Sequence, residues 1–487
     1  MARKRAGDQP VRITPATVRA ANPPEAHLPP LWYERLGGAQ MRSVCQTVSA
    51  GLDEHPWRTD PAHFVSVPKR FGGLRPVAVL SLSDRVRYEA LVRSLEPHID
   101  RALCGPTVLY GPRGHDRTLR WLSFERAILR GRSRYVVTAD VADFHASLDR
   151  GMALDVLRRG DADRHQIDRL ERFLDLAMDG RGGLPQSYRA SSALGSLCLA
   201  DLDRFMSLQG RHYIRCQDDI RISVRDLADA EDALSALKER LASLRLSLRT
   251  DKTEIAPTAE YQRLLHQGSR WEIFMWSRLA PVIEGGSLDH WLRPWGEALL
   301  GRIRSGGNRA VRARRTVAEL LDSDSPSPSV SQCRAMVAAL AVLRTTRDPA
   351  LSRFAPGLIA RFPSELPTVA RSLTTLLRTP GAAEARTTVV RLLLDCDLGQ
   401  GVRAAWLFWV LRSAAGQLPR PVIDQAAEAA GSDETEWVCR VQAAWLLAQA
   451  GAIDERLLAR LRESAPIQLS RALPGEPFER TLTATGS

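Results

Sequence analysis

The pattern of apolar residues changes partway along this chain of 487 residues. From about residue 65 to 257, short apolar runs typical of strands alternate with helical stretches, whereas the sequence after about residue 330 is almost wholly helical in pattern. A run rich in proline and serine lies between them at residues 322–330, and it cannot continue a helix. One hydrophobic core rarely grows beyond roughly 250–300 residues. The sequence therefore predicts an α+β domain joined by a linker to an all-α domain.

The helical part contains one clear internal repeat. Residues 402–407 read Val-Arg-Ala-Ala-Trp-Leu, and residues 441–446, which begin 39 positions later, read Val-Gln-Ala-Ala-Trp-Leu. This spacing is close to the period of about 40 residues in HEAT and armadillo repeats. We therefore expect residues 331–487 to form a HEAT-like stack of short antiparallel helices, with Trp406 and Trp445 in its core. Such a stack offers a concave surface to nucleic acid or to a second copy of the chain.

The charge of the chain points to a polyanionic partner. The formal net charge is +12 and the isoelectric point is about 9.8. A basic surface gains affinity for nucleic acid because it releases counterions from the phosphates. RNA or DNA is therefore the expected partner, and a basic surface that is merely solvated is the alternative.

Cysteine usage and hydropathy narrow the class of protein further. The seven cysteines lie far apart, with no Cys-x-x-Cys and no histidine pair at the spacing of metal ligands. Neither a disulfide framework nor a zinc site is predicted. The longest apolar runs fall well short of the ~20 residues that span a bilayer. We expect a reduced, cytoplasmic protein without a membrane segment.

Acidic residues stand at the ends of predicted strands. Residues 134–140 form an apolar run that ends in Asp140. Residues 213–224 form two alternating runs around a polar tip and are typical of a hairpin, with Asp218 and Asp219 at its turn. Each acid taken alone is weak evidence, because an Asp-Asp pair in a turn is more often part of a solvated loop.

Three converging carboxylates would support phosphoryl transfer. They could hold two divalent cations roughly 3.5–4 Å apart, one activating an attacking hydroxyl and one supporting the leaving oxygen. Mg²⁺ is the expected ion because it prefers hard oxygen ligands and substrate phosphates, and Mn²⁺ is the alternative.

Six blocks in order resemble the motifs of the reverse transcriptase family along most of residues 65–255. The blocks are Val67-Pro68-Lys69-Arg70 with Gly72-Gly73-Leu74-Arg75-Pro76, Tyr110-Gly111-Pro112-Arg113-Gly114, Asp140, Gly183-Leu184-Pro185-Gln186-Ser187, Asp218-Asp219, and Leu246 to Thr253. The resemblance implies a right-hand polymerase fold with fingers and palm, RNA-directed DNA synthesis, and dNTPs as substrates.

The resemblance also implies roles for individual residues. Asp140, Asp218 and Asp219 match the catalytic, metal-binding aspartates of the family. Lys252 matches a lysine thought to protonate the leaving pyrophosphate, and it is one of only four lysines in the chain. The residues that match nucleotide or template contacts are Lys69, Arg75, Arg113, Pro185 and Gln186.

The chain departs from the family pattern at several positions. Cys216 and Gln217 stand where the family has Tyr-x, and Ser187 replaces a glycine. His145 stands where the family has an aromatic residue that excludes the 2′-hydroxyl of a ribonucleotide, so it is a further nucleotide-binding candidate. An RNA-dependent RNA polymerase is therefore the alternative enzyme, and a nucleic-acid-binding module with a degenerate palm is the alternative without chemistry.

The predicted organisation has five parts. They are an N-terminal extension (1–64), fingers and palm (65–257), a thumb-like or connecting region (258–321), a linker (322–330) and the helical-repeat domain (331–487). This arrangement is similar to the bacterial abortive-infection and unknown-group reverse transcriptases, which are implicated in defence against phage. The resemblance implies an antiphage role, and it leaves open synthesis without a template or primed from the enzyme's own side chain.

Overall fold

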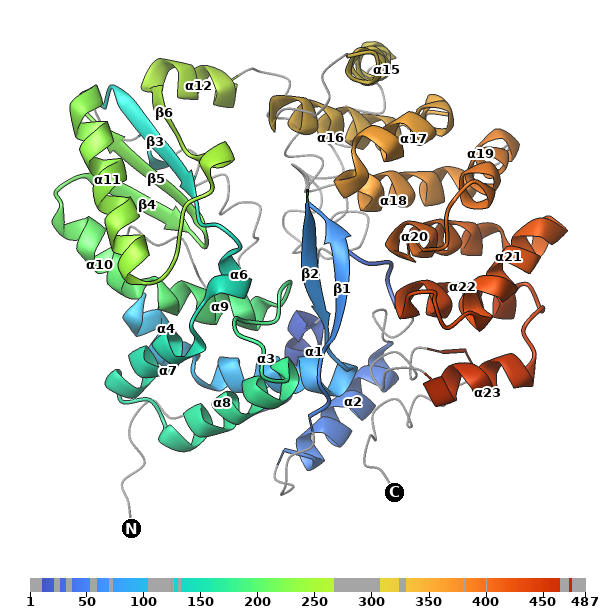
Figure 1. Ribbon diagram of the computed structural model, residues 1–487, viewed down its shortest axis with the longest axis horizontal. Helices are drawn as coiled ribbons and strands as arrows, with labels where there is room; N and C mark the ends of the chain where they lie inside the picture. Colours follow the sequence, from blue (N-terminus) through green and yellow to red (C-terminus); the bar gives the residue numbers. More distant parts are fainter. Residues whose placement is uncertain are drawn as a thin grey trace.

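The computed structural model places a sheet-based part and a stack of helices on opposite sides of a β-hairpin (Figure 1). The residues that the structure describes are 11–21, 27–31, 37–52, 59–69, 73–103, 124, 127–129, 133–266, 307–323, 330–379, 382–399, 401–464 and 473–474.

Four short strands form an antiparallel sheet. They are β3 (Tyr135–Asp140), β4 (His212–Cys216), β5 (Asp219–Val224) and β6 (Glu254–Pro257), in the order β4-β5-β3-β6. Alternate residues of a strand point to opposite faces. Val137 and Ala139 of β3 therefore join the core beneath the sheet, together with Ile220 and Ile222 of β5. The predicted strand and hairpin are confirmed.

The helices of the sheet-based part mostly share one hydrophobic core with this sheet. They are α3 (Leu82–Ser94), α4 (Glu96–Ala102), α6 (Phe144–Ser147), α7 (Arg150–Arg159), α8 (Arg164–Met178), α9 (Arg189–Cys198), α10 (Ala200–Leu208), α11 (Leu227–Ser243) and α12 (Thr258–His266), with a 3₁₀ turn η2 (Thr250–Lys252). Helix α11 packs against β3, β5 and β6. Asp149, Asp163 and Asp226 fix the starts of α7, α8 and α11, because each side chain accepts a hydrogen bond from a first-turn backbone N–H.

The hairpin between the two sides consists of β1 (His63–Pro68) and β2 (Leu74–Val79). Its strands pair so that Val67 lies opposite Arg75. Val65, Val67 and Val77 belong to the same hydrophobic core as the helical stack. Two N-terminal helices, α1 (Pro15–Ala21) and α2 (Gly38–Ala50), also contribute to this core. Apolar packing against these helices therefore holds the hairpin in place.

The C-terminal part is a two-layered stack of helices. Its elements are α15 (Gly307–Leu321), α16 (Val330–Thr345), α17 (Ala350–Arg361), η3 (Pro363–Glu365), α18 (Leu366–Leu377), α19 (Ala383–Leu394), α20 (Gly401–Leu411), η4 (Arg412–Gln417), α21 (Arg420–Gly431), α22 (Trp437–Gln449) and α23 (Glu455–Ser464). Helices α16, α18, α20 and α22 pack successively on one another, and so do α17, α19, α21 and α23. Figure 1 shows this succession from α15 to α23 along one side of the molecule.

The repeated sequence lies on neighbouring helices of one layer, because its two copies occupy α20 and α22, which pack together. Trp406 is fully buried as expected, whereas Trp445 is partly exposed. Helix α15, which falls in the region predicted as thumb-like or connecting, packs on α16 and α17. The HEAT-like character of the helix pairs stays a prediction.

An N-terminal segment is tied to this stack. The indole N–H of Trp406 donates to the carbonyl oxygen of His27 at 3.1 Å, and the side-chain amide of Gln442 donates to the carbonyl oxygen of Pro30 at 3.3 Å. The two donors come from the neighbouring helices α20 and α22. Residues 27–31 therefore belong structurally with the helices, although they lie at the other end of the sequence.

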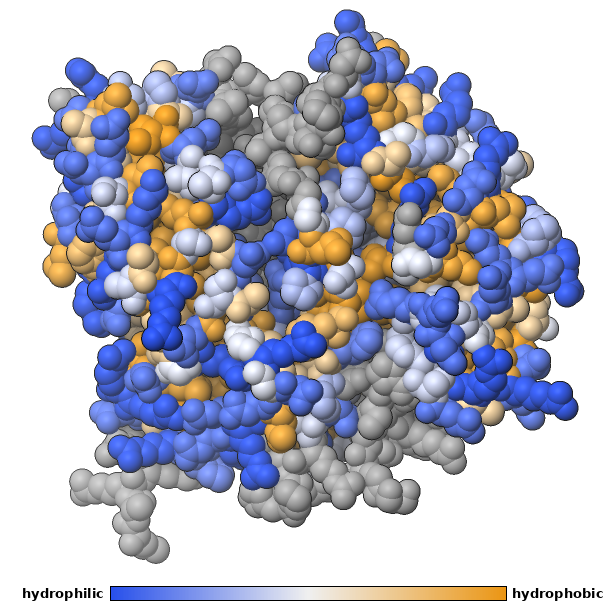
Figure 2. Space-filling model, viewed as in Figure 1, coloured by the Kyte–Doolittle hydropathy of each residue, from blue (hydrophilic) through white to orange (hydrophobic). Residues whose placement is uncertain are grey.

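Hydrophilic residues cover the outer ends of the stacked helices and the edge formed by α7 and α8, whereas hydrophobic residues show in patches over the sheet-based part and over the stack (Figure 2). Among the described residues, no helix combines the length and the apolar character needed to cross a membrane.

Candidate active site

The pairing of two strands brings the predicted aspartates together. Asp140, the last residue of β3, lies directly opposite Asp219, the first residue of β5. Because Val137 and Ala139 face the core, Asp140 points to the other face of the sheet. Asp218 occupies the turn between β4 and β5, and its carbonyl oxygen accepts a hydrogen bond from the N–H of Val141 at 3.2 Å. The three aspartates thus share one end of the sheet.

The turn itself has an unusual backbone. Gln217 has a φ of 59°, which lies in the left-handed region that most residues avoid. Arg215 supports this turn from behind, because its guanidinium donates to the carbonyl oxygen of Gln217 at 2.8 Å. Arg215 is fully buried and forms an ion pair with Asp203 of α10. A buried charge pair therefore positions the hairpin that carries Asp218 and Asp219.

The electrostatic surroundings of the aspartates favour a cation. Burial raises the pKa of Asp218, and the neighbouring Asp140 raises it further. Burial also raises the pKa of Asp219 to about 7, against the opposing effect of Arg221, whose guanidinium lies 3.7 Å from the carboxylate. Because this pKa is raised from its ordinary value near 4, the folded chain loses stability as the pH rises from about 4 to about 7, and above that Asp219 is ionised at its full cost. A divalent cation would offset this cost, so the donor chemistry fits a hard metal ion.

The side chains are not gathered as a metal centre in this conformation. Within the described segments, no group of three His, Cys, Asp or Glu side chains is placed so that it could hold a metal ion. Asp140 instead accepts a hydrogen bond from Lys252 at 2.7 Å. Arg249 lies 3.9 Å from the same carboxylate and is held by Asp251 at 2.5 Å. Lys252 therefore neutralises the first aspartate, a contact that the sequence did not indicate.

Two residues of the hairpin β1–β2 reach the same region. Lys69, which directly follows β1, forms an ion pair with Asp143, located between β3 and α6. Arg75 of β2 is half-buried, and burial lowers its pKa, while Asp218 and Asp140 act in the opposite direction. The structure thus brings the predicted triphosphate-binding residues to the side of the aspartates.

The loop that contains Pro185 and Gln186 contacts strand β2 of the hairpin. With its amide oriented to satisfy both partners, Gln186 accepts from Nε of Arg75 at 3.3 Å and donates to the carbonyl oxygen of Pro76 at 3.3 Å. Pro185 is buried, and its carbonyl oxygen accepts a hydrogen bond from the hydroxyl of Ser191. Gln186, one of the two residues predicted to position the nucleotide, therefore contacts the hairpin strand that carries Arg75.

His145 lies against the start of this loop. Its carbonyl oxygen accepts a hydrogen bond from the N–H of Leu184 at 2.8 Å. Gly183 has a φ of +77°, and a Cβ at this position would lie 2.5 Å from the carbonyl oxygen of His145. Only glycine permits this close approach. The imidazole of His145 packs edge-on to Phe144, with ring centroids 5.2 Å apart.

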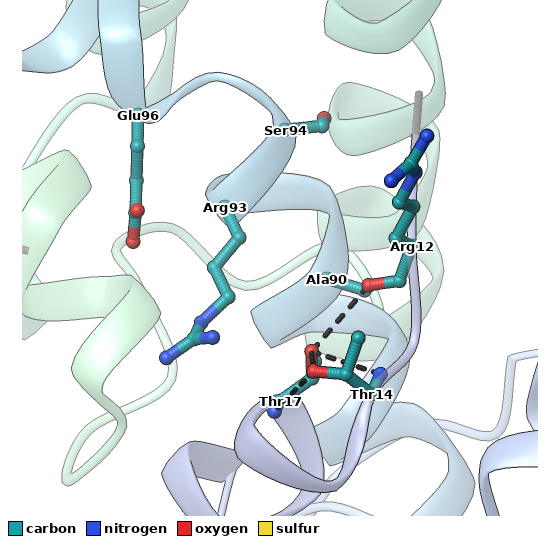
Figure 3. Close-up of a pocket in the computed structure, with 7 residues that line it drawn as sticks. All are labelled: Arg12, Thr14, Thr17, Ala90, Arg93, Ser94 and Glu96. Atoms are coloured by element: carbon teal, nitrogen blue, oxygen red, sulfur yellow. Dashed lines mark hydrogen bonds between the residues drawn. The ribbon is translucent and has the colours of Figure 1, made fainter. Parts of the chain in front are cut away.

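Arg113, the remaining predicted contact, lies outside the described residues. A cavity of about 420 Å³ lies between α1 and α3, where Arg12, Thr14 and Arg93 line it (Figure 3). None of its lining residues is among the predicted site residues.

The comparisons with known proteins agree with this geometry. Residues 67–264 match the family described as reverse transcriptase (RNA-dependent DNA polymerase). The chain contains a reverse transcriptase domain. The prediction of a fingers–palm domain is thereby confirmed for these residues, and the match supports a polymerase that transfers nucleotides.

Other comparisons add little to the reverse transcriptase domain. The chain is similar to the solved structure of telomerase from Candida albicans in complex with a TWJ fragment of telomeric RNA, with 10% identity, a TM-score of 0.32 and coverage of 69% of this chain. The match spans 64% of the telomerase chain, less than two thirds. A similarity this weak carries no conclusion about fold or function. No curated protein matches the chain significantly.

Several residues around the candidate site had no signal in the sequence. Asp203 supports the aspartate hairpin through Arg215. The hydroxyl of Tyr188 accepts from the N–H of Leu80 at 3.0 Å and donates to the carbonyl oxygen of Ala78 at 3.0 Å, so it ties the end of β2 to α9. Polar residues that bridge distant elements leave no periodic pattern in the sequence. Only an alignment of homologous sequences could have indicated these residues.

Proposed function

We propose that this chain is an RNA-directed DNA polymerase that transfers nucleotides at Asp140, Asp218 and Asp219. The observation that carries the proposal is the pairing of Asp140 with Asp219 at the ends of two adjacent strands, beside Asp218 in the turn. This arrangement lies within the reverse transcriptase domain. Its substrates would be dNTPs, and its partners would be an RNA template and the growing DNA.

The three aspartates would hold two Mg²⁺ ions, for which Mn²⁺ could substitute. When bound, such ions activate the attacking hydroxyl and stabilise the leaving oxygen. Lys252 would first release the carboxylate of Asp140, to which it is now hydrogen-bonded. Its ammonium group would then be available to protonate the leaving pyrophosphate.

The neighbouring residues would bind and orient the nucleotide. Lys69 and Arg75 would grip the triphosphate, because both come from the hairpin beside the aspartates. Arg113 would contact the nucleotide or the template, and Gln186, together with Pro185, would hold the base pair through its link to Arg75. The imidazole of His145 would face the sugar and select against a 2′-hydroxyl.

The proposal extends to a biological role in antiphage defence. Its support is the combination of a reverse transcriptase domain with a stack of helices, together with the net charge of +12. The stack would bind nucleic acid or a second copy of the chain. Synthesis could be templated, template-independent or primed from a side chain of the protein. Survival of phage-infected cells that express the chain, compared with cells that express Asp218→Asn, tests this role.

One experiment tests the activity. Purified protein is incubated with each dNTP or rNTP, with and without an RNA template and primer, in Mg²⁺ or Mn²⁺, and the products are sequenced. We expect metal-dependent incorporation of dNTPs. Incorporation of rNTPs alone would identify an RNA polymerase, and nucleic-acid binding without incorporation in any condition would identify a binding module.

A further inference from the structure

The basic residues of the site are neutralised by carboxylates of the chain itself. Lys252 is bonded to Asp140, and Lys69 is paired with Asp143. The second pair differs from an ordinary surface ion pair in what it joins. Lys69 follows β1 of the hairpin, whereas Asp143 follows β3 of the sheet that carries the aspartates. The pair therefore links the two elements between which a nucleotide would bind.

The backbone presents Asp143 to these cations. Its φ of 43° and ψ of 38° lie in the left-handed region, which Asp and Asn tolerate better than other residues that have a Cβ. The side chain of Asp143 is 61% exposed, and that of Lys69 is 22% exposed. The carboxylate therefore already borders solvent, into which it can rotate.

Further cations surround the same carboxylate. The hydrogen bond from Lys69 lowers the pKa of Asp143, burial opposes this effect, and the charges of Lys69, Arg249 and Arg75 lower the pKa further. Asp143 is therefore fully ionised at neutral pH. It is one negative charge among three basic residues, which is the environment that a phosphate group requires.

We propose that Asp143 is an internal counter-ion that occupies Lys69 until the triphosphate of a nucleotide displaces it. This inference rests on the proposed function, because it assigns the same site a competitor for the substrate. A triphosphate carries more negative charge than one carboxylate and accepts more hydrogen bonds, so it displaces Asp143 from Lys69. Asp143 then rotates into solvent. Asp143 thereby weakens nucleotide binding. In the absence of a nucleotide, it holds the hairpin against the sheet.

Asp143→Asn tests this competition. Asn keeps the left-handed backbone and the size of the side chain while it removes the charge. The matched control is Asp155→Asn, because Asp155 is 62% exposed and is also ion-paired, with Arg158 at 3.1 Å on α7. Dissociation constants are measured by equilibrium dialysis for a dNTP, for inorganic tripolyphosphate and for a deoxynucleoside without phosphate.

An exposed ion pair contributes little, so we expect Asp143→Asn to bind the dNTP and tripolyphosphate about two- to fivefold more tightly than the parent. Binding of the deoxynucleoside should not change, and Asp155→Asn should match the parent throughout. In a Lys69→Gln background the gain from Asp143→Asn should vanish, because the residue for which it competes is gone. Equal or weaker triphosphate binding by Asp143→Asn would overturn the proposal, and so would a gain that persists without Lys69.

The test separates this inference from the proposed function. Binding is measured directly and does not require catalysis, and the same comparison is repeated in the Asp218→Asn background. One outcome is that the parent protein incorporates no nucleotide while Asp143→Asn still binds triphosphates more tightly in the Lys69-dependent way expected. In that case the counter-ion role stands and the proposed polymerase activity is wrong. If the parent incorporates nucleotides but the constants are equal, the counter-ion role is wrong and the activity stands.

Discussion

The buried pair of Arg215 and Asp203 should be the most sensitive structural feature behind the aspartate hairpin. Arg215 is fully buried, its Nε donates to Asp203 at 2.7 Å, and the hydroxyl of Tyr213 donates to the same carboxylate at 2.7 Å. Asp203→Asn preserves the shape of this network but leaves the positive charge of Arg215 without a counter-ion. Breaking a buried pair in this way costs about 3–5 kcal/mol.

This cost can be measured as a shift in the melting temperature of the domain. For a domain of about 150–250 residues, 1 kcal/mol shifts the melting temperature by about 2–4 °C, so Asp203→Asn should lower it by about 6–20 °C. Differential scanning calorimetry of the whole chain measures this shift.

A second variant separates the unpaired charge from simple loss of packing. The triple variant Asp203→Leu, Arg215→Met and Tyr213→Phe replaces the network with apolar side chains, an exchange that is often close to neutral for a buried pair. It should recover most of the lost stability but not the activity, because the carbonyl oxygen of Gln217 loses its donor at the hairpin turn. A melting temperature of Asp203→Asn equal to that of the parent would refute this reasoning. An equal loss in the single and triple variants would show that the cost does not come from an unpaired charge.

Substitutions at three further positions test the parts of the site. Lys252→Ala should slow turnover by about 10²–10⁴-fold, a smaller loss than that caused by Asp140→Asn. Single-turnover rates that fall equally in the two variants would make Lys252 a structural residue. His145→Phe should tighten and His145→Ala should relax selection of dNTPs over rNTPs; competition assays that show an unchanged preference would place the selecting residue elsewhere. Gly183→Ala should destabilise the fold by about 1–3 kcal/mol, because φ is +77° and the added Cβ would meet the carbonyl oxygen of His145 at 2.5 Å; an unchanged melting temperature would contradict this steric account.

Local patterns were enough to predict the elements that carry the aspartates. The apolar run before Asp140 and the alternation on either side of Asp218 and Asp219 depend only on neighbouring residues, and they appear as β3, β4 and β5. The facing of Asp140 and Asp219 depends on the register between strands far apart in sequence. Periodicity carries no such information, so convergence of the acids could be expected only from the family resemblance.

The contacts that stabilise the site could not be predicted. Charged residues such as Arg215 and Asp203 are mostly exposed in proteins, and nothing local indicates that they meet inside the core. The pairing of Lys69 with Asp143 likewise depends on how the hairpin docks on the sheet. The repeat in the helical part predicted neighbouring helices, but not that Trp406 would bind the backbone of His27 near the other end of the chain.

The central claim is that Asp140, Asp218 and Asp219 carry nucleotide transfer. The most direct test compares metal-dependent dNTP incorporation by the parent, by each Asp→Asn variant at these three positions and by the control Asp155→Asn, with melting temperatures measured on the same samples. The account predicts that each of the three variants folds and loses incorporation, while the control retains the activity of the parent. Undiminished incorporation by a folded variant at any of the three positions would contradict it.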